Sequence, residues 1–107
     1  MLPGPGAVNE AMVGEYRDER FEWDEAKAAR TLRERGISFE LAREVFTELA
    51  IEREDERKDY GEHRSEVIGP VRGRLTVVIY TWRGERRRLI SVRKANDREV
   101  RFYVKHI

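Results

Sequence analysis

The sequence of 107 residues lacks cysteine altogether and contains few prolines. The absence of cysteine excludes a disulfide framework, a zinc ribbon and thiol chemistry. No apolar run approaches the ~18 residues that predict a membrane-spanning helix, and residues 1–20 lack the basic start and apolar stretch of a secretion signal. The length is enough for one small hydrophobic core. We therefore expect a single-domain protein of the cytoplasm without membrane association.

Negative charge is scarce in the second half of the chain. Residues 63–107 contain 12 Lys+Arg against 4 Asp+Glu, whereas residues 1–62 contain 10 against 17, so the net charge of +1 conceals two opposite halves. Most of the basic residues in the second half are arginines, whose planar head with five donors suits phosphate. This composition favours a polyanionic partner, RNA or DNA first. The alternative is that the arginines are ordinary solvent-exposed residues of the strands and bind no partner.

The chain divides into a leader and a domain. Residues 1–20 show no clear hydrophobic period and predict a flexible leader, so the domain is expected over residues 21–107. The hydrophobic pattern of the domain predicts the order β-α-α-β-β-β-β-α. This order indicates an α+β fold, with an antiparallel sheet of about four to five strands, two N-terminal helices on one face and a short C-terminal helix.

Capping residues mark the expected helices in the first half. A short strand at Phe21–Trp23 precedes Asp24, which is a suitable N-cap, and Gly36 ends a helix over residues 25–35. Ser38 begins a second helix, whose apolar residues recur at helical spacing and are expected to face the core: Leu41, Ala42, Val45, Phe46 and Leu49. A strand is expected to start at residues 49–51.

The second half changes to a β pattern. Strands are expected at residues 64–69, 75–82 and 86–94, the last two joined by a two-residue hairpin loop at Gly84-Glu85. Asn96 and Glu99 form a capping pair for the final helix, which carries an apolar stripe at Val100, Tyr103, Val104 and Ile107.

The hairpin loop assigns side chains to the two faces of the sheet, because it places Arg83 opposite Arg86 and Ile79 opposite Ile90. One face is apolar in its middle and is expected to lie under helices: Leu75, Val77, Ile79, Thr81, Arg88, Ile90, Val92 and Lys94. The other mixes aromatic, hydroxyl and arginine side chains, which is typical of a ligand-binding surface: Arg74, Thr76, Val78, Tyr80, Trp82, Arg87, Leu89, Ser91 and Arg93. Whether Arg64 joins that surface depends on the turn at residues 69–73.

The sequence offers no metal-binding or cofactor-binding motif. His63 and His106 are far apart, and a glycine-rich phosphate loop and a Gly-x-Ser-x-Gly elbow are missing, so we expect neither metal nor cofactor. RNA cleavage needs none, because the 2′-hydroxyl is the nucleophile and cations can stabilise the phosphate. Tyr80 and Trp82 could stack on bases, or they could be buried. His63 could be a general base, or an ordinary surface residue.

Several motifs resemble the BrnT-type toxins. Residues 21–29 (FEWDEAKAA) resemble the opening of that family, followed by Gly36-Ile37-Ser38-Phe39, Glu62-His63-Arg64, Ile68-Gly69, Gly73–Val78, Leu89–Ala95, Arg98-Glu99 and Tyr103. The resemblance implies a type II toxin with a RelE-like ribonuclease fold that cleaves RNA and inhibits translation. It also implies a DNA-binding antitoxin of the BrnA type, and the toxin is expected to contact operator DNA only through this antitoxin. By position, Arg64, Ser91 and Arg93 fall on the family motif.

These observations combine into one hypothesis and one rival. The hypothesis is a metal-independent endoribonuclease in which Arg64 and Arg93 bind the scissile phosphate and Tyr80 positions RNA or moves a proton. Further RNA contacts are expected from Arg74, Trp82, Arg87, Ser91 and Lys94. The picture requires Arg93 to be free on an open face of the sheet. Since the sequence shows no unambiguous acid–base pair, the rival is a non-catalytic module that binds nucleic acid or the antitoxin in operon autoregulation.

Overall fold

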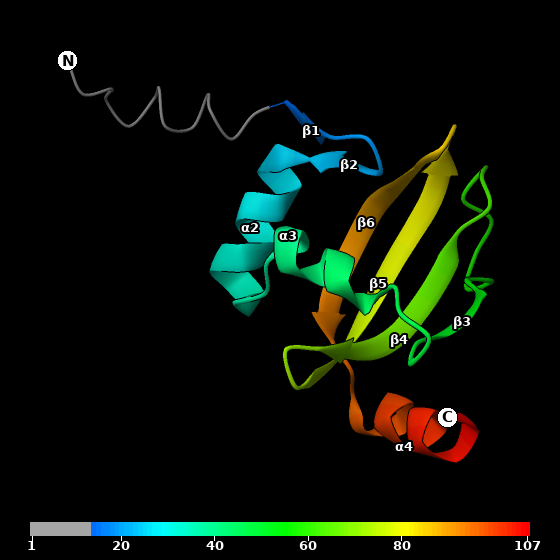
Figure 1. Ribbon diagram of the computed structural model, residues 1–107. Helices are drawn as coiled ribbons and strands as arrows, with labels where there is room; N and C mark the ends of the chain where they lie inside the picture. Colours follow the sequence, from blue (N-terminus) through cyan, green and yellow to red (C-terminus); the bar gives the residue numbers. More distant parts are fainter. Residues whose placement is uncertain (1–13) are drawn as a thin grey trace.

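The computed structural model describes residues 14–107, which form a six-stranded sheet in the order β1-β2-β6-β5-β4-β3 with short helices around it (Figure 1). The pair β2–β6 is parallel and all other neighbours are antiparallel. The elements are β1 (Glu15–Arg17), β2 (Phe21–Asp24), α2 (Glu25–Arg35), α3 (Phe39–Ala42), the 3-10 turn η1 (Arg43–Val45), β3 (Ile51–Glu54), β4 (Ser65–Val71), β5 (Arg74–Arg83), β6 (Arg86–Lys94) and α4 (Asp97–His106).

The expected α+β fold and its order of elements are confirmed. The sheet begins earlier than the expected boundary at residue 21, because Glu15–Arg17 forms β1 and the Tyr16 ring stacks on Trp23 with centroids 4.1 Å apart. The rest of the expected leader, residues 1–13, lies outside the described residues. Among residues 14–107, no helix combines the length and the apolar character needed to cross a membrane.

The helix ends confirm the predicted caps. The Asp24 side chain accepts the N–H of Ala26 at 3.1 Å, and Gly36 ends α2 with a left-handed φ of 67°. At α4, the Asn96 side chain accepts the N–H of Glu99, and the Glu99 carboxylate accepts the N–H of Asn96. This reciprocal capping box satisfies donors that the first turn of a helix otherwise leaves free.

The second helix is shorter than expected. Ala42 and Val45 are buried as predicted, but helical structure ends at Val45, and Leu41 and Leu49 are exposed. The reason lies in the tertiary packing of the segment that follows: Ala50 passes close to the backbone of β4, where a Cβ added to Gly69 would lie 3.2 Å from its Cα. A helix continued to Leu49 could not turn the chain into β3 at that point.

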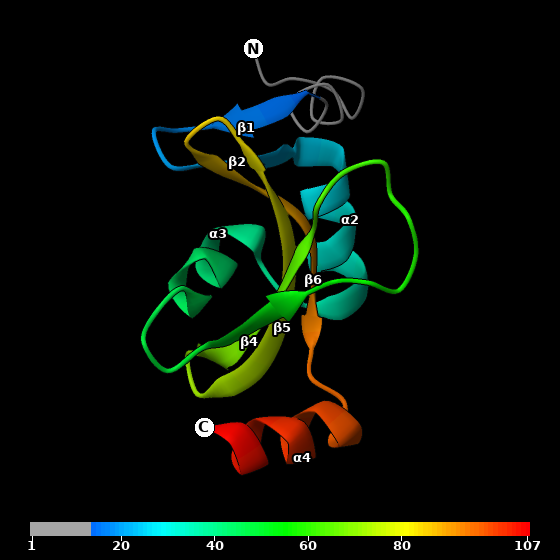
Figure 2. The same cartoon turned by 90° about the vertical axis from the view of Figure 1, so that its right-hand side faces the viewer.

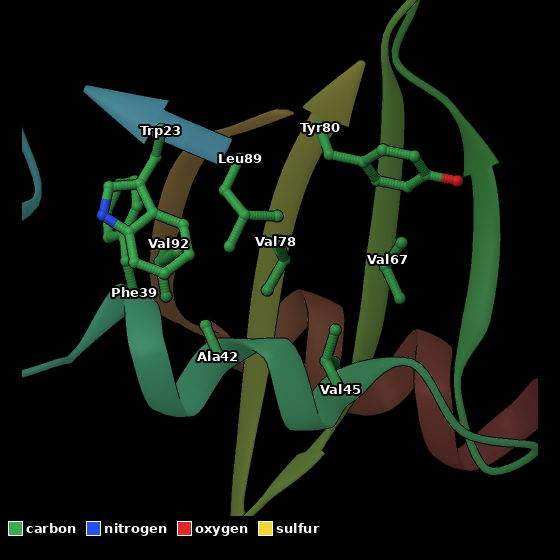
Figure 3. Packing of buried hydrophobic residues seen from close by; sticks show 9 residues of the cluster. All are labelled: Trp23, Phe39, Ala42, Val45, Val67, Val78, Tyr80, Leu89 and Val92. Atoms are coloured by element: carbon green, nitrogen blue, oxygen red, sulfur yellow. The ribbon is translucent and has the colours of Figure 1, made fainter. Parts of the chain in front are cut away.

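Each face of the sheet packs against different elements. The α3 face lies under α3 and η1, which contribute Phe39, Ala42 and Val45 to the larger core cluster (Figure 3); its strand residues are Val67, Val78, Tyr80, Leu89 and Val92. The α4 face lies under Phe102 and Tyr103 of α4; its strand residues are Ile68, Val77, Ile79, Ile90, Ser91 and Arg93. Figure 2 shows α3 on one side of the sheet and the β3–β4 loop on the other.

A bulge in β6 overturns the predicted face assignment. The two-residue loop and the pair Arg83–Arg86 are confirmed, but the register shifts between Tyr80–Leu89 and Ile79–Ser91, so Ile90 is an extra residue. Since side chains alternate along a strand, this extra residue exchanges the faces of everything after it. Val92 therefore joins the covered α3 face, and Arg93 moves to the α4 face. The predicted open surface around Val78 and Tyr80 is in fact the main core.

Candidate functional site

The bulge separates the predicted site residues into two groups. Arg74, Tyr80, Trp82, Arg87 and Lys94 belong to the side of α3. Ser91 and Arg93 belong to the α4 face, opposite Ile79 and Val77. The turn between β4 and β5, whose length the sequence did not settle, has two residues, Arg72 and Gly73. The resulting register places Arg64 on the same side of the sheet as Arg88 and Ile90, and the three residues line a cavity together. Arg64, Ser91 and Arg93 thus share one face, and Tyr80 does not.

Tyr80 is a core residue. Its side chain is 2% exposed, its ring meets Phe46 edge-on at 5.2 Å, and its hydroxyl donates to the Glu52 carboxylate. Burial, with a further contribution from Glu52, raises the pKa of the Tyr80 phenol. Of the two alternatives left open for Tyr80, the structure supports burial. An RNA base or phosphate on the sheet surface would not reach its hydroxyl.

Arg87 and Trp82 belong to a cluster of one guanidinium group and three aromatic rings at the hairpin end of the α3 side. The Arg87 guanidinium lies over three rings, 4.2 Å from the centroid of Phe46, 4.7 Å from Trp82 and 5.4 Å from Tyr80. Trp82 is half exposed (49%), so of the two alternatives for this residue, burial is excluded. Arg74 and Lys94 lie near the opposite end of the same strands, paired with Val71 and Thr76. These four residues therefore do not make one surface patch.

Arg93 is held by its own helix. Its two terminal nitrogens donate to the two carboxylate oxygens of Glu99, both at 2.7 Å, and the side chains are 30% and 9% exposed. The hydrogen bonds from Arg93 lower the pKa of Glu99, and the same bonds raise the pKa of Arg93. The expectation that Arg93 stands free on an open face is therefore wrong in this conformation. The physical cause is the bulge, which brings Arg93 under the first turn of α4.

The Arg93 cleft, between β3, β4 and the start of α4, has a volume of about 640 Å³. Its charged lining comprises Arg53, Arg57, Arg93 and Arg98 with Glu54, Asp55, Glu56, Glu66 and Glu99. Three of the arginines are paired with carboxylates: Arg53 with Glu66 and Arg57 with Asp55, both at 2.8 Å, and Arg93 with Glu99. Five carboxylates against four guanidinium groups leave the cleft with a net charge of −1.

The Arg64 cavity, between α2 and the hairpin, has the opposite balance. It measures about 220 Å³ and is lined by four basic residues, Lys27, Arg64, Arg83 and Arg88, and two acids, Asp24 and Glu62. Arg88 is neutralised from outside the cavity by Glu15 at 2.8 Å and Glu22 at 3.1 Å, so the rest of the lining has a net charge of +1. Glu62 is shared, since Arg64 Nε donates to it at 3.1 Å and Arg83 Nη2 at 3.4 Å. The Arg64 guanidinium also lies 4.0 Å from the centroid of the Tyr60 ring. This cavity is the candidate anion site of the α4 face.

Lys27 is the site residue that reasoning from the sequence missed. Burial lowers the pKa of its ammonium group, and Arg64 lowers it further. Two signals in the sequence could have identified it: it lies within the motif at residues 21–29, and it follows the N-cap Asp24 by three residues, which places both on one side of the first helical turn. His63, in contrast, is an exposed residue whose Nδ1 lies 3.0 Å from Glu54 Oε1.

Comparison with known proteins identifies a family. A family model described as the ribonuclease toxin BrnT of type II toxin–antitoxin systems matches residues 23–99. A search of curated proteins found no match. The matched segment runs from β2 into the first turn of α4, so it includes Lys27, Arg64, Ser91, Arg93 and Glu99.

Proposed function

Since the chain belongs to the BrnT family of ribonuclease toxins, we propose that it is a metal-independent endoribonuclease that cleaves RNA and thereby inhibits translation in the cytoplasm, on a RelE-like fold. Membership of a type II toxin family implies an antitoxin partner. We propose that this antitoxin is of the BrnA type, that it binds DNA, and that the toxin contacts operator DNA only through it.

The observation that carries the proposal is the Arg64 guanidinium, whose two terminal nitrogens have no partner among the contacts of the described residues. Apart from Arg88, which Glu15 and Glu22 neutralise, the lining of its cavity has three basic residues against two carboxylates and so attracts a phosphate. In the Arg93 cleft, by contrast, three of the four arginines are paired with acids. In the contacts among residues 14–107, Arg64 uses Nε to bind Glu62. Its two terminal nitrogens remain available to bind both free oxygens of a phosphate, the geometry for which a guanidinium is best suited.

The chemistry follows from what RNA itself supplies. The 2′-hydroxyl oxygen forms a bond to the adjacent phosphorus, the bond from phosphorus to the 5′-oxygen breaks, and a 2′,3′-cyclic phosphate remains. Negative charge grows on the two free phosphate oxygens, where preorganised cations lower the barrier most effectively. We assign this stabilisation to Arg64, with Arg83 beside it in the same cavity.

Lys27 is the proposed general base. Burial and the neighbouring Arg64 lower the pKa of its ammonium group, which increases the fraction present as a neutral amine near pH 7. The amine takes the proton of the 2′-hydroxyl, and the leaving 5′-oxygen takes a proton from water. Ser91 and Arg93, on the same face, are proposed to contact the phosphate of a neighbouring nucleotide. The proposed site does not include Tyr80.

Cleavage of RNA in the presence of EDTA tests this proposal. We expect the wild-type protein to cleave and to leave 2′,3′-cyclic phosphate ends, and Arg64→Ala to be slower by at least about 100-fold, as for other single stabilising donors. Arg33→Ala removes the same charge from an exposed position of α2 and should stay within about twofold of wild type. Cleavage that requires added Mg²⁺, or equal rates for Arg64→Ala and Arg33→Ala, would contradict the proposal.

The pairing of the arginines in the Arg93 cleft with carboxylates favours the rival, a non-catalytic binding module. That reading predicts salt-sensitive binding of RNA that stays intact in every variant. The EDTA experiment separates the two functions, because only the enzyme produces cyclic phosphate ends.

A further inference from the structure

We propose that the Arg93 cleft is a second phosphate-binding site for the RNA substrate, which Glu99 fills in this conformation, so that the first turn of α4 restrains the toxin. The inference rests on the proposed function. It adds the place where a neighbouring phosphate of the RNA binds and the side chain that blocks this place.

The contact between Glu99 and Arg93 has the form of an occupied phosphate site. A carboxylate and a phosphodiester both present two oxygens to the two terminal nitrogens of a guanidinium. Glu99 uses both of its oxygens and both Arg93 Nη atoms, at 2.7 Å each. With that fork engaged, a phosphate cannot bind Arg93 in the same manner.

The charge of the cleft in this conformation opposes RNA binding. The five carboxylates and four guanidinium groups of its lining sum to −1, which repels a polyanion. Without Glu99, the same lining contains four of each and is neutral. Arg93 would then present an unpaired fork to the substrate, while Arg53 and Arg57 keep their own partners Glu66 and Asp55. Removal of one carboxylate thus ends the net repulsion and frees the Arg93 fork for a phosphate.

Release of Arg93 requires only that the Glu99 side chain leaves it, because the start of α4 is itself fixed to the sheet, where the Ala95 N–H donates to the Leu75 carbonyl at 3.0 Å. Only Ala95 and Asn96 separate β6 from α4. The helix is anchored farther along, where Phe102 and Tyr103 pack against the α4 face and the Tyr103 hydroxyl donates to the Leu49 carbonyl at 2.7 Å. The outer side of the helix is exposed at Val100 and Val104. The ion pair is therefore the principal polar link of the first turn to the sheet among the described contacts.

Glu99→Gln tests the inference, since glutamine also serves in a capping box and so keeps the helix start, while the charge on Arg93 is no longer neutralised. The matched control is Asp97→Asn, the same charge change at an exposed position of the same turn. The probe is a 2′-O-methyl RNA oligonucleotide, which cannot be cleaved. We expect Glu99→Gln to bind it at least about fivefold more tightly than wild type, and Asp97→Asn to change its affinity by less than about twofold.

Addition of Arg93→Ala to Glu99→Gln should abolish the gain, and circular dichroism should show the same helix content in all variants. Equal affinities of Glu99→Gln and Asp97→Asn for the oligonucleotide would overturn the inference. Cleavage of unmodified RNA is measured in parallel: if the wild type cleaves and Glu99→Gln gains nothing, the restraint is wrong and the ribonuclease stands. If neither cleaves while Glu99→Gln binds more tightly, the phosphate site stands and the proposed catalysis fails.

Discussion

Three arginines of this protein show how strongly the surroundings of one side chain decide what it can bind. Arg87 is covered by three aromatic rings, Arg93 has both terminal nitrogens on one carboxylate, and Arg64 binds Glu62 through Nε. All three carry the same charge at any physiological pH. They differ in how many donors remain for a ligand, and this difference is why the proposed catalysis depends on Arg64.

Tyr80 gives a prediction at the same scale. Tyr80→Phe removes the hydrogen bond to Glu52 but keeps the ring packed against Phe46. We expect the free energy of unfolding to fall by about 1 kcal/mol, the usual net value of such a bond, because the hydroxyl is buried. RNA cleavage should change by less than about twofold. Urea unfolding and the EDTA cleavage assay measure the two effects, and a large loss of cleavage in a stable variant would restore Tyr80 to the catalytic site.

Among the elements, the β1–β2 hairpin depends on one carboxylate. Asp18 accepts the backbone N–H groups of Arg20 and Phe21, both at 2.8 Å, as well as the Tyr16 hydroxyl and Arg43 Nη1. The hydrogen bond from the Arg20 backbone contributes most to lowering the pKa of Asp18 to about 2. A carboxylate with this many donors fixes the turn that joins β1 to the sheet.

The stability of the protein should accordingly depend on pH through Asp18. Because the pKa of Asp18 is lowered on folding, its contribution is complete above about pH 4 and is lost as the pH falls through 2. We expect Asp18→Asn to lower the free energy of unfolding at pH 7 by about 1 kcal/mol, since a third of the side chain is exposed and solvent screens it. Thermal unfolding of both proteins between pH 2 and 7 should show this difference vanish at the acid end; a constant difference would contradict the assignment.

Local signals predicted the elements well, and one non-local feature defeated the prediction of the site. Asp24, Gly36, Asn96 and Glu99 define helix ends through contacts with their own neighbours in the chain, so the sequence alone locates them. The bulge at Ile90 has no such local signal. It depends on how β6 fits into the sheet between β2 and β5, and α2 contributes to this by donating from Arg35 Nη1 to the Val92 carbonyl.

The candidate site was consequently predicted only in part. Arg64, Ser91 and Arg93 were identified by their position in a motif, and the structure places them on one face. The placement of Ser91 and Arg93 on the face of Tyr80 was wrong, because alternation was counted through the bulge, and the face of Arg64 had been left open. The Glu99–Arg93 pair escaped prediction since Glu99 had already been explained by its capping role, which it performs at the same time.

The whole molecule is nearly neutral, with a formal charge of +1, so any affinity for RNA must come from how its charges are arranged. The Arg64 cavity concentrates positive charge at one end of the α4 face, and the acids of the Arg93 cleft offset the arginines at the other. Long-range attraction is therefore weak, and binding is expected to depend on a few direct phosphate contacts.

This arrangement predicts a shallow salt dependence. With at most the phosphates of the two proposed sites neutralised, the logarithm of the binding constant for single-stranded RNA should fall with the logarithm of salt concentration with a slope no steeper than about −1.4. Arg64→Ala should reduce the magnitude of that slope by about 0.7, and Arg33→Ala should leave it unchanged. Fluorescence anisotropy with the 2′-O-methyl oligonucleotide at several KCl concentrations measures both. A slope unaffected by Arg64→Ala would remove Arg64 from the phosphate contacts.

The extra residue at Ile90 also has a consequence for how this molecule tolerates change. After Ile90, the alternation of side chains between the two faces of the sheet is reversed relative to the first half of β6. Loss of a single residue there would turn over the distal half of the strand, sending Val92 to the α4 face, where Arg93 now binds Glu99, and Arg93 into the hydrocarbon of the main core under α3. Insertions and deletions near Ile90 should therefore be tolerated less well than substitutions, both in natural variation and in a library of variants.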